Sequence, residues 1–166
     1  MSRVDLACAA DIAAIAAIEQ RAFSDPWSER SFHDVLAHSR MYFACIREDG
    51  DGYTAARVVG YVVAWFAGGQ GEIANLAVDE AVRGRGLGAA LLAAALDEAR
   101  RLGTEEVFLE VRNSNMRARQ LYESRGFIEV GRRRRYYRRP VEDAIILRWT
   151  EAFGAGARAT STRNAK

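Results

Sequence analysis

The sequence contains few of the residues that hold metals or form disulfides: it has two cysteines, two histidines and a single lysine. Cys8 and Cys45 do not stand at CxxC spacing, which excludes a disulfide scaffold and a cysteine zinc site. His33 and His38 have no cysteine or histidine at ligand spacing. We therefore expect no metal site.

Long hydrophobic runs and a targeting segment are also absent. The longest apolar run, residues 58–69, is too short for a membrane helix and is rich in β-branched and aromatic residues. The apolar residues 12–18 near the N-terminus lie between Asp11 and Glu19 and have no basic segment before them. These absences predict a cytoplasmic protein that has no contact with a membrane.

Most of the positive charge lies in one stretch. Residues 131–140 hold six arginines and two tyrosines, whereas the net charge of the chain is only +2. A basic run with interleaved aromatic residues suggests a nucleic-acid patch. The rest of the chain is not basic and no RNA-binding motif is present, so we do not expect direct nucleic-acid binding. Read as a strand, the run alternates between two faces, with Arg132, Arg134 and Tyr136 on one and Arg133, Arg135 and Tyr137 on the other.

Hydrophobic periodicity predicts a single α/β domain over residues 1–152. The remaining residues, 153–166, are small and polar, and we expect a disordered tail there. The expected order is strand, two helices, three strands, helix, strand, helix and two strands. The corresponding ranges are 4–9, 10–22, 28–37, 41–48, 57–67, 71–78, 87–102, 105–111, 115–125, 127–137 and 142–149.

A glycine-rich loop, "RGRGLG" at residues 83–88, stands between a predicted strand and a predicted helix. Glycines let backbone N–H groups turn toward an anion, and the N-terminus of the following helix is positively polarised. The loop fits neither the P-loop pattern nor the dinucleotide fingerprint. A plain strand-to-helix turn needs only one glycine, so three at alternate positions favour a pyrophosphate site.

Two further residues carry possible acid–base chemistry. Glu110 stands between Leu109 and Val111 in an otherwise apolar strand. A carboxylate there would be costly unless it is paired, exposed or functional. Glu110 is either a general base, an exposed residue or the partner of Arg112 two residues along. Tyr122, on the next helix, is either a proton donor or part of the core.

Arg83-x-x-Gly86-x-Gly88 resembles the [QR]xxGx[GA] acetyl-CoA motif of the GCN5-related N-acetyltransferase (GNAT) family. The resemblance covers about residues 3–150. It implies one domain with a mixed, mostly antiparallel central sheet, a splayed strand pair and flanking helices. Residues 18–32, 109–127 and 136–147 resemble the RimI-type branch, which acetylates the N-terminal alanine of a small-subunit ribosomal protein in bacteria.

The resemblance also implies a role for particular residues. Glu110 would be the base, with Glu72 as the rival, and Tyr122 would protonate the sulfur of coenzyme A. The cosubstrate acetyl-CoA would contact Leu76, Ala77, Val78, Arg83, Gly84, Arg85, Gly86, Leu87, Gly88 and Asn115. Asn115 could also cap its helix, a role compatible with contacting the cofactor. The acceptor groove would be lined by Trp27, Tyr136 and Tyr137, of which Trp27 is alternatively a loop anchor.

Two other functions remain open from the sequence. One keeps the fold but acetylates a lysine side chain or a small amine. The other is a ribosome- or RNA-binding module that uses the arginine run.

Overall fold

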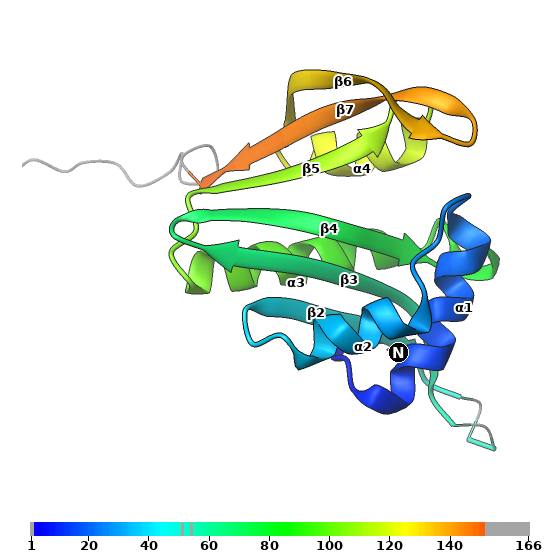
Figure 1. Cartoon of the computed structure of the whole chain (residues 1–166). Helices are drawn as coiled ribbons and strands as arrows, with labels where there is room; N and C mark the ends of the chain where they lie inside the picture. Colours follow the sequence, from blue (N-terminus) through cyan, green and yellow to red (C-terminus); the bar gives the residue numbers. More distant parts are fainter. Residues whose placement is uncertain (1, 51, 54, 152–166) are drawn as a thin grey trace, which may run out of the picture.

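The computed structural model describes residues 2–50, 52–53 and 55–151, so the tail expected over 153–166 lies outside the described residues. The described residues form one seven-stranded sheet in the order β1-β2-β3-β4-β5-β7-β6 (Figure 1). Its strands are β1 (Ser2–Leu6), β2 (Met41–Glu48), β3 (Arg57–Ala67), β4 (Gln70–Val78), β5 (Glu106–Arg112), β6 (Ile128–Arg138) and β7 (Val141–Thr150). Its helices are α1 (Ile12–Ala22), α2 (Glu29–Ala37), α3 (Leu87–Arg101) and α4 (Met116–Ser124). The expected element order and the mixed α/β class are confirmed.

The start of the chain differs from the expectation. Residues 4–9 were expected to be a strand and 10–22 a helix, but β1 ends at Leu6 and α1 begins at Ile12. A short 3-10 turn, Ala9–Asp11, lies between them. Asp11 explains the change, because its carboxylate accepts the backbone N–H of Cys8 at 2.8 Å and closes this turn.

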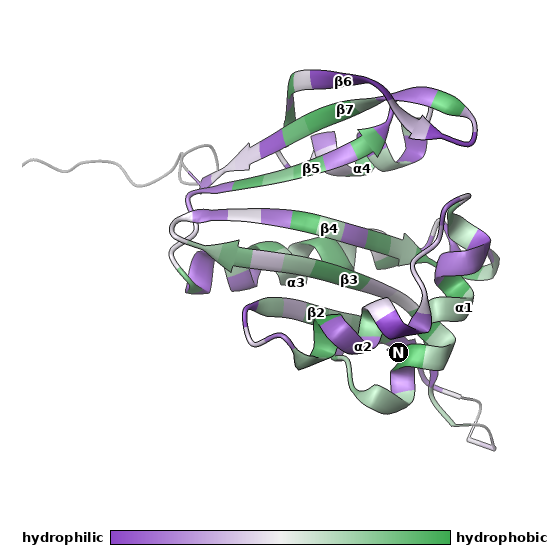
Figure 2. Ribbon diagram, in the orientation of Figure 1, coloured by the Kyte–Doolittle hydropathy of each residue, from purple (hydrophilic) through white to green (hydrophobic). Residues whose placement is uncertain are grey.

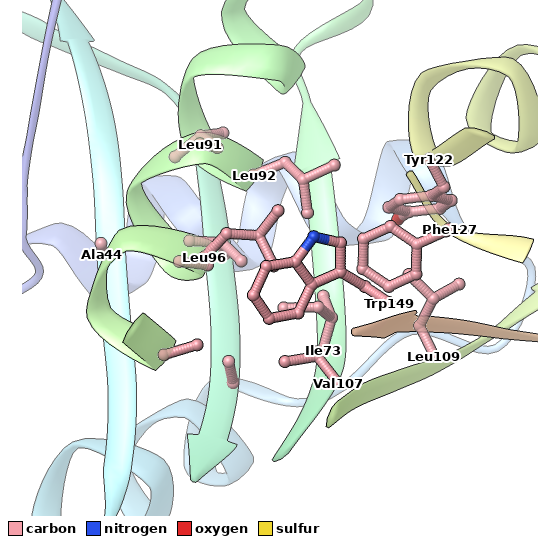
Figure 3. Packing of buried hydrophobic residues seen from close by; sticks show 14 of the residues in the cluster. Ala44, Ile73, Leu91, Leu92, Leu96, Val107, Leu109, Tyr122, Phe127 and Trp149 are labelled. Atoms are coloured by element: carbon pink, nitrogen blue, oxygen red, sulfur yellow. The ribbon is translucent and has the colours of Figure 1, made fainter. Parts of the chain in front are cut away.

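Helices cover both faces of the sheet, so its central strands are buried on both sides. In β3, Val62 and Ala64 pack into the core under α3, whereas Tyr61 and Val63 pack into the core under α1 and α2. Figure 3 shows Leu92 and Leu96 of α3 against Trp149 of β7, which joins the two halves of the sheet on one face. In Figure 2 the central β3 is largely hydrophobic, whereas the edge strand β6 is mostly hydrophilic.

The sheet opens in its middle, between β4 and β5. These strands pair in parallel only from Gln70 to Glu72 against Glu106 to Phe108, and then diverge (Figure 1). A bulge supports the divergence: Val63 pairs with Asn75 while Ala64 pairs with Ile73, which leaves Ala74 as the extra residue of β4. The splayed strand pair is therefore present, and beyond Glu72 it leaves one edge of β4 without a strand partner among the described residues.

A second bulge interrupts the arginine run. Arg133 pairs with Ala144 and Tyr137 pairs with Glu142, so three residues of β6 stand opposite the single residue Asp143. Arg135, inside the bulge, has a left-handed φ of 52°, and its backbone N–H donates to the Asp143 carboxylate at 2.9 Å. The simple two-face alternation expected for this stretch is therefore wrong, because the bulge changes the register.

No helix in the described part of the chain is long and apolar enough to cross a membrane.

Candidate active site

The glycine loop leads into the N-terminus of α3. Gly84 and Gly86 have φ values of +83° and +77°, which side-chain-bearing residues rarely adopt. Gly88 serves a different purpose, because a Cβ there would lie 3.3 Å from the Leu121 side chain on α4. The first intrahelical bond of α3 runs from Ala90 N–H to Gly86 C=O, so the preceding N–H groups of the helix are directed at the loop. This arrangement suits a phosphate group.

A cavity of about 500 Å³ lies over this helix start. All the residues predicted to contact acetyl-CoA line it except Arg85: Leu76, Ala77, Val78, Arg83, Gly84, Gly86, Leu87, Gly88 and Asn115. Arg85 points elsewhere, and its guanidinium forms an ion pair with Glu48 at 3.0 Å. The Asn115 side chain also accepts the backbone N–H of Ala118 at 3.2 Å, so this residue caps α4 as well.

A second cavity, of about 690 Å³, lies further back along β4. Its walls include the predicted base Glu110, the rival Glu72 and the predicted acceptor residues Trp27, Tyr136 and Tyr137. Phe23, just after α1, lines both cavities. One strand, β4, also contributes to both, through residues 72–75 in the second and 76–78 in the first. The two cavities therefore adjoin each other, on consecutive stretches of β4.

Glu110 is paired with Arg133 rather than with Arg112, the partner that the sequence offered as one alternative. The Nε of Arg133 donates to Glu110 Oε1 at 2.5 Å, and the glutamate side chain is 23% exposed. Arg112 instead bonds the carbonyl oxygens of Arg139 and Pro140, at 3.2 and 3.1 Å. Its other partners are the side chains of Ser24 and Glu142. Glu110 thus faces the second cavity while its Oε1 is bonded to the Arg133 guanidinium.

Glu72 lies in the same cavity as Glu110. Its Oε2 accepts the indole N–H of Trp65 at 3.2 Å. Both candidate bases, Glu72 and Glu110, therefore line the second cavity, and the geometry does not choose between them.

Tyr122 is buried rather than exposed in either cavity. Its ring packs edge-on against Phe127, with centroids 5.7 Å apart (Figure 3). Burial raises the pKa of its hydroxyl far above the ordinary value, and Tyr137 adds to the shift. Its helix neighbours Ala118 and Leu121 line the first cavity, so Tyr122 stands directly behind that wall.

The two tyrosines of the arginine run come together in the second cavity. The bulge sets the rings of Tyr136 and Tyr137 edge to face, with centroids 5.2 Å apart. The guanidinium of Arg112 lies 4.2 Å from the centre of the Tyr137 ring. Burial, followed by the charge of Glu110, raises the pKa of Tyr137 to about 12. A hydrogen-bonding interaction with Glu110 is the main cause that raises the pKa of Tyr136.

Glu19 is a site residue that the sequence did not single out. It belongs to α1, is only 1% exposed, and lines the second cavity. It accepts hydrogen bonds from the Trp27 backbone N–H, the Asn75 side chain and the Tyr61 hydroxyl. Its place beside the isoleucines of an amphipathic helix indicates that Glu19 is buried. Its three partners lie in other segments of the chain, so the sequence pattern does not identify them.

Among the described residues there is no group of three or more His, Cys, Asp or Glu side chains that could hold a metal ion.

Residues 12–127 match the Acetyltransferase (GNAT) family. The chain is 39% identical over 141 residues to the [ribosomal protein bS18]-alanine N-acetyltransferase of Escherichia coli K12, covering 82% of this chain and 89% of that protein. It is 37% identical over 143 residues to the N-alpha-acetyltransferase RimI of Mycobacterium tuberculosis, covering 84% and 86%. The crystal structure of the Escherichia coli ribosomal-protein-S18-alanine N-acetyltransferase superposes with a TM-score of 0.81 at 31% identity, covering 99% of this chain and 100% of that one.

Proposed function

The chain belongs to the GNAT family of acetyltransferases, and from this premise we propose that it acetylates the N-terminal α-amine of a ribosomal protein, with alanine as the first residue. The acetyl donor is acetyl-CoA. The observation that carries the proposal is the pair of adjoining cavities on β4: one lies at the glycine loop, and the other is lined by carboxylates and tyrosines. The acceptor is inferred from the relatives whose names specify bS18.

The first cavity fits the donor. Its glycine loop and the free N–H groups at the start of α3 suit the pyrophosphate of coenzyme A. The unpaired edge of β4 at Leu76–Val78 offers backbone groups to an extended, amide-containing arm. A backbone N–H on this edge would also stabilise the negative charge that develops on the thioester oxygen.

The second cavity fits the acceptor amine. An N-terminal α-amine has a pKa of about 7.7–8.0, against about 10.4 for lysine, so a carboxylate suffices to remove its proton near neutral pH. We assign this step to Glu110, acting directly or through one water, because the resemblance gives the base role to this position and the residue faces the cavity from β5; Glu72, in the same cavity, is the rival. The neutral nitrogen then attacks the thioester carbon, the C–N bond forms, and the C–S bond breaks.

We assign protonation of the leaving sulfur to Tyr122. Its pKa is raised by burial, so the hydroxyl keeps its proton at physiological pH and is available as a donor. Its helix neighbours Ala118 and Leu121 line the donor cavity, and Tyr137, which adds to the rise of its pKa, lines the acceptor cavity. The nitrogen releases its second proton as the amide forms, and this proton, passed through water, restores the Tyr122 hydroxyl. Glu110 returns the first proton to the solvent, so the products are the acetylated amine and free coenzyme A. A ribosomal-protein acceptor further implies that the reaction takes place in the cytoplasm.

A peptide panel tests the proposal. Release of free thiol from acetyl-CoA should be rapid with a free N-terminal alanine and absent when the same N-terminus is blocked. Mass spectrometry of the product should place the acetyl group on the α-nitrogen. Acetylation of an internal lysine in the blocked peptide would instead point to a lysine acetyltransferase.

A further inference from the structure

One arginine of the 131–140 run differs from the others, because it reaches the proposed base. Arg133 donates its Nε–H to Glu110 Oε1 at 2.5 Å. Its neighbour Arg132 makes a similar ion pair, at 2.8 Å, but with the exposed Glu129 on its own strand. The two residues are adjacent, have comparable side-chain exposure of 57% and 47%, and differ mainly in which carboxylate they hold.

The register of the sheet explains how Arg133 reaches across an entire strand. Arg112 of β5, Ala144 of β7 and Arg133 of β6 stand in one row, because Ala144 pairs with both arginines. Glu110 lies two residues before Arg112 and therefore on the same face. Ala144, in the middle of the row, has a small, buried side chain. Arg112 is held by other partners, so Arg133 is the arginine bonded to Glu110.

The β6 bulge completes the cluster. Arg133 is the last residue in register before the bulge, and Tyr136 follows inside it. The Arg133 guanidinium lies 5.8 Å from the centre of the Tyr136 ring, and Tyr136 also interacts with Glu110. Arg133 thus contacts both the proposed base and a proposed acceptor-binding ring.

We propose that Arg133 is a positioning residue that holds the Glu110 carboxylate in the orientation needed to take the proton of the acceptor amine. The proposal rests on the function assigned above. The glutamate side chain has several rotatable bonds. A hydrogen bond to one carboxylate oxygen fixes the orientation of the group and so directs the other oxygen at the bound amine. An ion pair as exposed as this one contributes little to folding, so its effect should be seen in turnover rather than in stability.

The test is a double-mutant cycle in the full-length protein. R133M, E110Q and the double variant are compared with wild type, using acetyl-CoA and an alanine-starting peptide. We expect R133M to lower kcat by about 5- to 20-fold, the coupling typical of partners in one hydrogen-bonded network. The KM for acetyl-CoA should be unchanged. In the E110Q background, R133M should cause no further loss, because the group that it positions is already gone.

Two further variants separate positioning from a general effect of charge. R132M removes the adjacent ion-paired arginine and should retain wild-type turnover. R133K should recover part of the activity, since a lysine supplies one donor without the planar guanidinium. Thermal unfolding of all variants should stay close to that of wild type.

Other outcomes overturn the proposal in recognisable ways. Normal turnover in R133M beside a slow E110Q enzyme means that Glu110 is the base but needs no positioning. Equal losses from R133M in both backgrounds, or an equal loss from R132M, mean that Arg133 acts independently of Glu110. Full activity of E110Q would show that Glu110 is not the base and that Arg133 therefore does not position one. Absence of thiol release by the wild-type protein would overturn the proposed function itself.

Discussion

The buried carboxylate of Glu19 accepts the backbone N–H of Trp27 across 3.0 Å. This bond joins helix α1 to the segment before α2 that lines the acceptor cavity. The same carboxylate accepts both hydrogen bonds of the Asn75 amide, at 3.0 Å each, next to the β4 bulge. No arginine or lysine pairs with Glu19 in the described part of the chain, so hydrogen bonds alone stabilise this buried group. Trp27 is thus anchored through its backbone and through its ring, which packs against Phe32 with centroids 5.6 Å apart, and it also lines the acceptor cavity.

Replacing Glu19 with alanine should therefore lower both stability and acceptor binding. Three donors would lose their acceptor, and we expect a fall in the free energy of unfolding of about 2–4 kcal/mol. Urea denaturation measures this fall. Tyr61→Phe removes only one of the donors and should cost less, at about 1 kcal/mol. If E19A and Y61F are equally stable, the carboxylate is not the centre of this network.

Gly86→Val should weaken the binding of acetyl-CoA. Gly86 has a φ of +77° at the N-cap of α3, and a valine there strains the loop that faces the phosphate groups. Loss of one charge-assisted hydrogen bond costs about 1.5–3 kcal/mol, so we expect the KM for acetyl-CoA to rise by about tenfold or more. The matched control is Gly52→Val, because Gly52 shares a positive φ of 88° in an exposed loop that lines neither cavity. An equal rise of KM in both variants would show that the glycine loop at residues 83–88 does not bind acetyl-CoA.

Tyr122→Phe should slow turnover while preserving the fold. Phenylalanine keeps the edge-on contact with Phe127 and removes only the hydroxyl. Loss of a general acid lowers kcat by about 10²- to 10⁴-fold, and the KM for either substrate should change little. Tyr42→Phe is the control, because Tyr42 is also partly buried with a raised pKa but lies outside both cavities. Wild-type kcat in Y122F would show that solvent protonates the leaving sulfur.

The donor half of the site was more predictable than the acceptor half, for a physical reason. Most of the predicted donor residues lie in two nearby stretches, the end of β4 and the glycine loop, so a local motif locates them, whereas the lining from α1 and α4 comes from elsewhere in the chain. The acceptor residues converge from α1, the following loop, β4, β5 and β6. Their meeting depends on bulges in β4 and β6, and nothing in the local sequence marks which residues are extra. The sequence offers Arg112, two residues away, as one possible partner of Glu110, whereas the structure brings Arg133 to it from across the sheet.

The buried tyrosines should make the protein sensitive to alkali. Burial is the main cause that raises the pKa values of Tyr61 and Tyr122, and it raises that of Tyr137 to about 12. Burial also raises the pKa of the Cys45 thiol to about 12. In the unfolded chain these groups titrate near their ordinary values, about 10 for tyrosine and 8.5 for cysteine. Above those values the unfolded state releases protons that the folded state retains, so a rise in pH favours unfolding.

Stability from this source should therefore be constant below about pH 8 and should fall steadily between about pH 9 and 12. Each group that stays protonated contributes a slope of at most about 1.4 kcal/mol per pH unit. Lysines do not obscure the effect, because Lys166 is the only one in the chain. Urea unfolding at stepped pH, with tyrosinate absorbance as a second signal, measures the slope. In Y122F the fall of stability with pH should be less steep, by the contribution of one group. The same slope in wild type and Y122F would mean that the Tyr122 hydroxyl titrates normally in the folded protein.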